Sequence, residues 1–150
     1  MVQTKQGIYA RYIKRILDVL LSGCALVLLS PMLLIVAILV RTKLGSPVIF
    51  CQERPGKDEK IFKMYKFRSM TDARDENGEL LPDDVRLTHF GRVLRSTSLD
   101  ELPQLWNVIK GDMSLVGPRP IVTKEIERYG DYFREYSMVL PGITGMWQAR

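Results

Sequence analysis

The stretch that decides how this chain is organised is SLDELPQLWNVIKGDMSLVGPRP, residues 98–120. It begins with two adjacent acids, Asp100 and Glu101, which are followed by Pro103 and a short apolar segment. It ends in a turn-rich run with one cation, Arg119, between two prolines. Because proline fixes its own φ, this run predicts a rigid turn in which Arg119 has little freedom to lose. A pre-positioned guanidinium suits a phosphate, so the stretch indicates the outline of a reaction centre.

Two helix starts fit the acid pair. Ser98 with Glu101 three residues later matches a capping box, whereas Asp100 as the cap would place Pro103 in the first turn, where a missing N–H costs little. Both starts put Asp100 and Glu101 at a helix N-terminus. Unpaired amides and the positive end of the helix dipole favour an ionised carboxylate there, so the sequence predicts that Asp100 is an anion at neutral pH.

An ionised Asp100 has two relevant chemistries and one plain alternative. It can attack an electrophile to form a covalent intermediate, or it can hold a divalent metal through oxygen. Glu101 can then serve as an acid or base, or as a second anchor. The alternative is that both acids only cap the helix, and the spacing alone leaves this open.

The composition of the chain limits the size of its core, the kind of partner it binds and the kind of metal site it can form. A chain of 150 residues with 46% hydrophobic content can bury one modest core. The net charge of +5 indicates an anionic partner, either nucleic acid, an anionic membrane surface or a phosphorylated substrate. Cys24 and Cys51 lack CxxC spacing, which indicates a reducing compartment. His89, the single histidine, is expected to be structural, so a metal would be held by oxygen, with Mg²⁺ as the first candidate.

An apolar run near the N-terminus predicts a membrane element. Residues 19–40 are 22 residues without a charge, about 33 Å as a helix, which is long enough to cross a hydrocarbon core. Ser30 and Pro31 fall in the middle, where proline removes a backbone hydrogen bond and predicts a sharp bend. Cations flank both ends, so the positive-inside bias is best satisfied if both ends stay cytoplasmic.

These features favour a re-entrant helical hairpin that dips into one leaflet and returns. An ordinary spanning helix kinked at Pro31 remains an alternative, since prolines are tolerated in membranes. A signal peptide is disfavoured because no small-residue cleavage site follows, and a soluble core helix is disfavoured because no other segment is apolar enough to surround it.

The chain turns globular after Gly45. Two short β-favouring runs, residues 48–52 and 61–68, are separated by the turn signal Pro55-Gly56, which predicts a β-hairpin. The second run carries cations that either line a site or only solvate an edge strand: Lys60, Lys63, Lys66 and Arg68.

The remaining segments predict a surface loop and three helices. The acidic residues 71–84 are expected to form the loop, residues 85–95, 102–110 and 121–138 the helices, and residues 141–145 a turn. Arg95 comes just before the acids, where it can pair with Asp100, bind a phosphate or only complement the helix dipole. The fold class is therefore α+β, a mainly helical small domain with a β-hairpin and an N-terminal re-entrant membrane helix-break-helix.

These motifs together resemble the bacterial sugar transferase family, the monotopic phosphoglycosyl transferases that start glycan assembly on a polyprenyl phosphate. Four features carry the resemblance: Ser30-Pro31 in a basic-flanked apolar run, FKMYKFRSM at 62–70, the block at 98–120, and PGITG at 141–145. The resemblance implies a membrane part, residues 1–44, and a catalytic domain at the cytoplasmic face, residues 45–150. Family members continue beyond PGITG, so this domain is expected to be truncated at its C-terminus.

The resemblance also implies roles for single residues. Asp100 matches the nucleophile that attacks the β-phosphate of a UDP-sugar, and Glu101 matches its partner, which activates the lipid phosphate acceptor. Mg²⁺ held near Asp100 would offset charge on the diphosphate. Arg119 resembles a phosphate ligand, and Lys66 and Arg95 occupy positions that line the same pocket. Ser30-Pro31 matches the break that makes the membrane helix re-entrant.

The implied reaction transfers a sugar-1-phosphate from a UDP-sugar to undecaprenyl phosphate and releases UMP. It is the first membrane step of glycan assembly, for O-antigen, capsule, exopolysaccharide or glycoprotein, at the cytoplasmic face of the bacterial inner membrane. Membrane lipid and downstream glycosyltransferases are the implied partners.

Three other functions compete with this one. The first is a catalytically inactive, membrane-associated scaffold of a glycan-assembly complex. The second is a Mg²⁺-dependent phosphohydrolase that uses water as the acceptor. The third, nucleic-acid binding, is motivated by the charge of +5 and disfavoured by the apolar run, so no nucleic-acid partner is expected.

Overall fold

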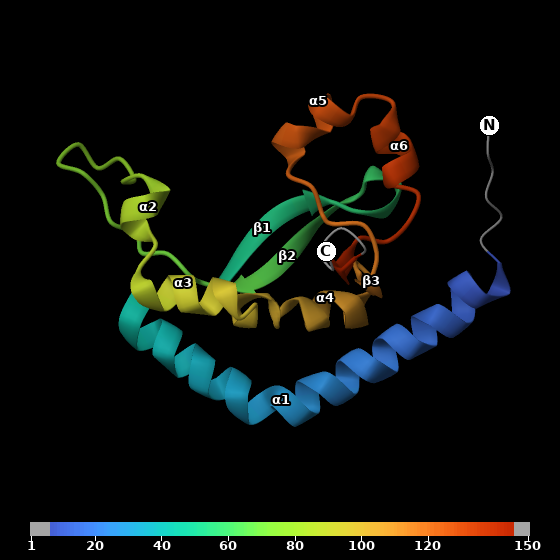
Figure 1. Ribbon diagram of the computed structural model, residues 1–150, viewed down its shortest axis with the longest axis horizontal. Coiled ribbons are helices and arrows are strands. Elements are labelled where there is room, and N and C mark those ends of the chain that lie inside the picture. The colour runs from blue at the N-terminus through green and yellow to red at the C-terminus, as the bar shows by residue number, and fades with distance from the viewer. Residues whose placement is uncertain (1–6, 146–150) are drawn as a thin grey trace. The chain divides into compact units, whose positions relative to one another are not determined.

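The computed structural model describes residues 7–145 and combines helices with short strands (Figure 1), which confirms the predicted mixture and its β-hairpin. The chain divides into two compact units. The first unit holds described residues 7–28, 53–63 and 105–145, and the second holds residues 29–52 and 64–104. These units are groups of residues that contact one another, whereas the predicted boundary near residue 44 separates a membrane part from a cytoplasmic part. That boundary stays a prediction.

The apolar run lies in one long helix, α1, Lys14–Leu44, preceded by a short π-helix, η1, Tyr9–Ile13. The most apolar window of α1 has a mean hydropathy of 2.8, and only 11% of that window is buried. By length and composition α1 can cross a membrane, and its exposure argues against a soluble core helix.

α1 continues without interruption through Ser30 and Pro31. The predicted break at Ser30-Pro31 is therefore not an end of the helix, and the predicted bend there stays a prediction. Proline removes one hydrogen bond of a helix, and the turns on either side can remain helical. The re-entrant path of α1 stays a prediction.

The predicted hairpin is present. β1, Ile49–Pro55, and β2, Ile61–Phe67, form a two-stranded sheet (Figure 1). Between them Gly56 and a single 3-10 turn, η2, Lys57–Glu59, reverse the chain. Each strand has residues in both units, so the hairpin contributes to both.

In the second unit the helix expected at 85–95 is two helices. α2, Asp83–Arg86, ends at Leu87, which is extended, and α3, His89–Ser96, begins after it. The Thr88 hydroxyl caps α3 by accepting a hydrogen bond from the Gly91 amide at 3.1 Å. This cap was not predicted, because the sequence pattern favoured a helix that begins earlier, at residue 85.

The core of the second unit forms where α1 meets β2 and α3. Its fully buried members come from these three elements: Val36, Val40, Leu44, Phe67 and Leu94. The three α1 residues follow one another at spacings of four, so they share one face of the helix. Residues 71–82 form the predicted surface loop, most of it exposed, with a single bridge between Arg74 and Leu80, and the predicted last residues, Asp83 and Asp84, belong to α2.

In the first unit, α4, Gln104–Lys110, stops at Gly111, whose φ of 99° is the left-handed conformation predicted for a helix stop. β3, Ser114–Val116, then pairs in parallel with β4, Gly142–Thr144. The prediction of a plain turn at 141–145 was therefore wrong. A Cβ on Gly142 would lie 2.1 Å from the Gly117 nitrogen, so the close approach of these segments requires glycine.

The long helix expected at 121–138 is also interrupted. It consists of η4, Thr123–Glu125, α5, Ile126–Tyr129, and α6, Tyr132–Tyr136. Gly130, with a φ of 49°, separates α5 from α6. α6 lies beside the turn of the hairpin (Figure 1), where the Asp58 amide donates to the Ser137 carbonyl at 2.8 Å.

Candidate active site

The acid pair lies on a short 3-10 turn, η3, Leu99–Glu101. Asp100 is buried, with 6% of its surface exposed, and Glu101 is partly exposed. Ser98 makes no side-chain cap and has a left-handed φ of 56°, and α4 begins only at Gln104. Ser98 is therefore the N-cap of η3, as one of the two predicted starts has it, but the predicted capping box is absent and the acids do not begin α4.

β2 brings a cation to the acid pair. Lys66 Nζ lies 2.9 Å from Glu101 Oε1, and both side chains are partly buried. The sequence singled out Lys66 as a cation of the second strand, and the structure joins it to the acids. The competing interpretation, that this lysine only solvates an edge strand, does not hold for Lys66.

The electrostatics of Asp100 differ from the prediction. Burial raises the pKa of the Asp100 carboxyl above its ordinary value, the charge of Glu101 adds to the rise, and Lys66 and Arg95 oppose it. The helix-terminus effect expected from the sequence has the opposite sign. It is weak here because Asp100 lies on one 3-10 turn rather than at the end of a long helix, so removal from water dominates.

Arg95 reaches the site from the last turn of α3. Its Nε donates to the Ser69 hydroxyl at 2.9 Å, and its charge acts on the Asp100 carboxyl. Among the described residues it forms no ion pair with Asp100, so of the three alternatives for Arg95 the structure does not show this one. α3 lies against the Ser69 backbone because Gly91 lacks a side chain, and a Cβ there would sit 1.9 Å from the Ser69 carbonyl oxygen.

Arg68, another predicted cation of β2, has a structural role. It is buried, its Nε donates to the Met70 carbonyl at 3.0 Å, and it also bonds the Ser46 carbonyl and pairs with Asp72. Each of its three guanidinium nitrogens therefore has a partner within the protein. His89 is exposed at the start of α3, where no catalytic role is assigned to it.

Arg119 belongs to the first unit, whereas Asp100, Glu101, Lys66 and Arg95 belong to the second. Its side chain is exposed, and its carbonyl oxygen accepts a hydrogen bond from the Tyr136 hydroxyl. Four of the five predicted site residues therefore lie in the second unit, and Arg119 lies in the first.

The acid pair could hold a metal ion only if a bound substrate supplied the remaining ligands of that ion. Within residues 7–145 no group of three or more His, Cys, Asp or Glu side chains gathers as a metal cage. Glu101 is already paired with Lys66, which leaves Asp100 as the carboxylate with capacity to spare. Mg²⁺ commonly binds one or two carboxylates together with substrate phosphates, so the residues present fit that mode of binding.

The sequence analysis missed a second buried acid. Asp18 on α1 is 6% exposed, lies 3.2 Å from Lys14 Nζ and accepts hydrogen bonds from the Ser114 hydroxyl at 2.6 Å and the Leu115 amide at 3.3 Å. Lys14 also donates to Ser114. The sequence signal was the Lys14–Asp18 spacing of four, which places both side chains on one face of a helix.

Arg15 strengthens the same attachment. Its guanidinium donates to the Ile109 carbonyl at 2.7 Å and to the Val108 carbonyl at 2.5 Å. These carbonyls belong to the last turn of α4, where a cation complements the helix dipole. The start of α1 is thus fixed to α4 and β3 by directional polar contacts within the first unit.

The described residues thus combine a mixed helix-and-strand fold with a long, exposed apolar helix and a buried acid near two cations. The chain belongs to the bacterial sugar transferase family, whose model matches residues 9–150.

Several curated proteins are similar to this chain. A protein of Bacillus subtilis (strain 168) described as "Uncharacterized sugar transferase EpsL" is 50% identical, over 91% of this chain and 67% of that protein. An "Undecaprenyl-phosphate galactose phosphotransferase" of Salmonella typhimurium is 44% identical, over 93% of this chain and 33% of that protein. A "UDP-glucose:undecaprenyl-phosphate glucose-1-phosphate transferase" of Klebsiella pneumoniae is 46% identical, over 90% of this chain and 30% of that protein. The chain thus spans between 30% and 67% of the length of these relatives.

Proposed function

We propose that this protein transfers a sugar-1-phosphate from a UDP-sugar to undecaprenyl phosphate and releases UMP, in two steps through a phosphosugar attached to Asp100. The observation that carries the proposal is the buried Asp100 carboxyl, whose pKa is raised, beside Glu101 and the charges of Lys66 and Arg95. A perturbed carboxyl next to cations is a frequent mark of a reactive site. The family and the names of two relatives support the reaction class.

In the first step an Asp100 carboxylate oxygen attacks the sugar-bearing β-phosphorus. A bond forms between that oxygen and phosphorus, and the bond from this phosphorus to the oxygen bridging to the α-phosphate breaks. UMP leaves with the bridging oxygen and its electron pair. Lys66 and Arg95 balance negative charge near Asp100, which matters because the nucleophile and its target are both anionic.

In the second step an oxygen of undecaprenyl phosphate attacks the same phosphorus. The bond between phosphorus and Asp100 breaks, the carboxylate is regenerated, and the sugar diphosphate lipid leaves. Glu101 accepts the proton of the lipid phosphate where that group is protonated. Two steps at one carboxylate predict ping-pong kinetics.

Asp100, with the diphosphate oxygens, would hold Mg²⁺. The metal would supply positive charge that stabilises the charge developing on the diphosphate. Lys66 and Arg95 would also supply positive charge, and they belong to the protein. Substituting them therefore separates their contribution from that of the metal.

The proposed location is the cytoplasmic face of the bacterial inner membrane, with α1 following a re-entrant path. The exposed surface of α1 is apolar along its length: Leu17, Leu20, Leu21, Val27, Leu28, Leu34, Ile35 and Ile38. Its N-terminal part instead buries the polar Asp18 and Ser22. Apolar side chains outside and polar ones inside suit a helix surrounded by lipid rather than water.

The test is UMP release by the detergent-solubilised protein from a panel of UDP-sugars, with and without undecaprenyl phosphate. The relatives are named for different sugars, so the panel includes UDP-galactose and UDP-glucose. The proposal expects lipid-dependent release that Asp100→Asn lowers by about 10³-fold or more. Release that ignores the lipid would indicate a hydrolase, and a folded protein that releases no UMP from any donor would leave the scaffold function.

A further inference from the structure

The loop that carries Arg119 is held by hydrogen bonds to consecutive backbone oxygens. Three carbonyls in a row accept a bond: those of Pro118, Arg119 and Pro120. Their donors come from three separate segments of the first unit. The Gly142 amide bonds the first at 2.9 Å, the Tyr136 hydroxyl bonds the second, and Arg54 Nη1 bonds the third at 3.4 Å.

The two prolines make this arrangement stiffer. Each fixes its own φ, so the backbone on either side of Arg119 has few conformations to choose from. Gly117 extends the attachment by donating its amide to the Thr144 carbonyl at 3.0 Å. With its backbone fixed and its side chain exposed, Arg119 presents its guanidinium at small entropic cost.

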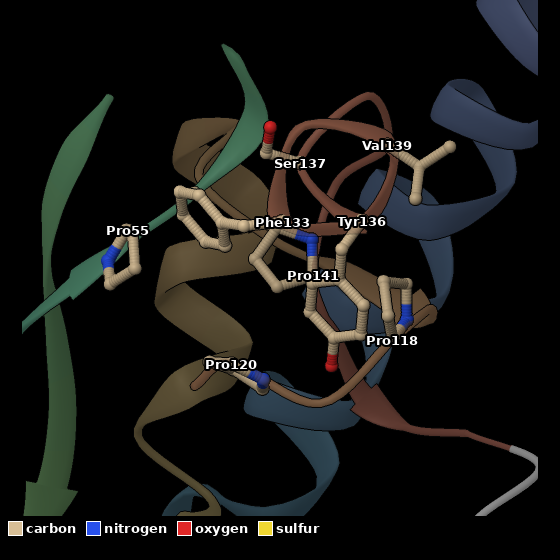
Figure 2. Close-up of a pocket in the computed structure, with 9 residues that line it drawn as sticks. Pro55, Pro118, Pro120, Phe133, Tyr136, Ser137, Val139 and Pro141 are labelled. Atoms are coloured by element: carbon tan, nitrogen blue, oxygen red, sulfur yellow. The ribbon is translucent and has the colours of Figure 1, made fainter. Parts of the chain in front are cut away.

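Tyr136 packs into this arrangement as well as bonding to it. Figure 2 shows its ring between Pro118 and Pro141, with the hydroxyl directed toward the segment that carries Pro118 and Pro120. Burial raises the pKa of the Tyr136 hydroxyl, so it stays protonated and remains a donor at neutral pH. On its other side the ring contacts Tyr129, with the ring centroids 5.5 Å apart.

Arg54 brings a second positive charge close to Arg119. Burial is the main cause that lowers the pKa of the Arg54 guanidinium, the charge of Arg119 lowers it further, and Glu125 opposes both. Two neighbouring guanidiniums repel each other, and an anion between them would relieve that repulsion. Arg54 therefore serves the loop through its bond to Pro120 and through its charge.

We propose that Tyr136 and Arg54 are positioning residues that fix the Arg119 loop, so that Arg119 is held ready for the diphosphate of the UDP-sugar. This inference rests on the proposed function, because the UDP-sugar of that reaction supplies the diphosphate. Neither residue was singled out in the sequence, since their roles come from contacts between distant segments.

The decisive variant is Tyr136→Phe, which keeps the ring and removes the hydroxyl. A contact to the diphosphate is made in both the ground state and the transition state, so its weakening raises KM and leaves kcat nearly unchanged. One hydrogen bond predicts a rise in KM for the UDP-sugar of about threefold to tenfold. The matched control is Tyr129→Phe, which alters the other ring of the pair and should leave KM unchanged.

Arg54 is tested by two substitutions. Arg54→Met removes the loop bond and the charge, and should raise KM more than Tyr136→Phe does. Arg54→Lys restores the charge and should recover part of the loss. Melting temperatures are measured for every variant, because a general loss of folding would lower kcat and stability together. A KM for Tyr136→Phe within twofold of the wild type, or a fall in kcat at unchanged KM, would overturn the proposal.

A second readout separates this proposal from the function on which it rests. Hydrogen exchange at the Gly117 and Gly142 amides reports opening of the loop without any substrate. We expect faster exchange at both amides in Tyr136→Phe and unchanged exchange in Tyr129→Phe. If the wild type releases no UMP from any donor, the proposed function fails and exchange alone decides the positioning claim. Equal exchange in Tyr136→Phe and the wild type would overturn that claim.

Discussion

Two aspartates with the same 6% exposure have opposite surroundings. Asp18, in the first unit, accepts hydrogen bonds from Ser114 and Leu115 and pairs with Lys14. Asp100, in the second unit, receives no hydrogen bond from another residue's side chain in the part of the chain that the structure describes, and burial raises its pKa. Burial alone therefore does not distinguish a structural acid from a reactive one.

The difference lies in how far each carboxylate is satisfied. A buried acid with matched donors holds elements together, as Asp18 holds the start of α1 to β3. A buried acid without matched donors keeps its carboxylate oxygens available for a phosphorus atom or a metal. In the absence of such a partner its burial lowers the stability of the fold. This contrast predicts opposite consequences for the same substitution at the two positions.

The largest expected effect is on stability at Asp18. Asp18→Ala removes the counter-charge of Lys14 and the acceptor of the Ser114 hydroxyl and the Leu115 amide. Breaking a buried pair is costly, but Lys14 is 35% exposed, so the expected loss is about 2–3 kcal/mol of unfolding free energy. Asp100→Ala should lose far less or gain, as measured by chemical or thermal unfolding in the same detergent.

Adding Lys14→Met to Asp18→Ala should recover part of the loss, because it removes the unpaired charge. Equal destabilisation by Asp18→Ala and Asp100→Ala would remove the distinction between the two acids.

The next effect is a pH dependence at Asp100. Its pKa in the folded state is raised, so its contribution to stability is full below the unfolded pKa and is lost as the pH rises through the folded pKa. Asp100→Asn does not titrate and should gain stability relative to the wild type as the pH rises above about 4, the ordinary pKa of an aspartate. Unfolding midpoints of both proteins from that pH to neutral pH measure the difference. A gap that narrows or reverses toward neutral pH would contradict the raised pKa.

The smallest stability effect is expected at Lys66. Its ion pair with Glu101 is partly exposed, with 25% and 33% of the two side chains accessible, so Lys66→Met should cost about 1 kcal/mol or less. Because Lys66 opposes the rise in the Asp100 pKa, its removal should move the acid limb of the pH profile of UMP release to higher pH. A large loss of stability with an unmoved acid limb would show that Lys66 is a structural residue like Lys14.

The sequence predicted those parts of the fold that depend on local patterns. The uncharged run of α1, the hairpin around Pro55-Gly56 and the stop at Gly111 follow from hydropathy and turn chemistry over a few residues. The pairing of β3 with β4 did not follow, because each strand has three residues and its partner is distant in the sequence. The interruption at Gly130 was missed because the apolar spacing on both sides suits one helix.

The sequence predicted the members of the candidate site that belong to a local motif, and it missed those that depend on packing between distant segments. Asp100, Glu101 and Lys66 were found from their residue types and from the family motif, and the Lys66–Glu101 pair is present. The sign of the Asp100 pKa change was missed, because it depends on burial rather than on a helix end. Arg54, Tyr136 and the contacts of Asp18 were missed because they arise only when distant segments pack.

The most direct test of the central claim is detection of the covalent intermediate. The wild-type protein is incubated with the UDP-sugar that supports UMP release, without lipid, then digested and examined by mass spectrometry. The account predicts a sugar phosphate on Asp100 that disappears when undecaprenyl phosphate is added and never forms in Asp100→Asn. A sugar phosphate on another residue, or one that persists in Asp100→Asn, would contradict the assignment of Asp100 as the nucleophile.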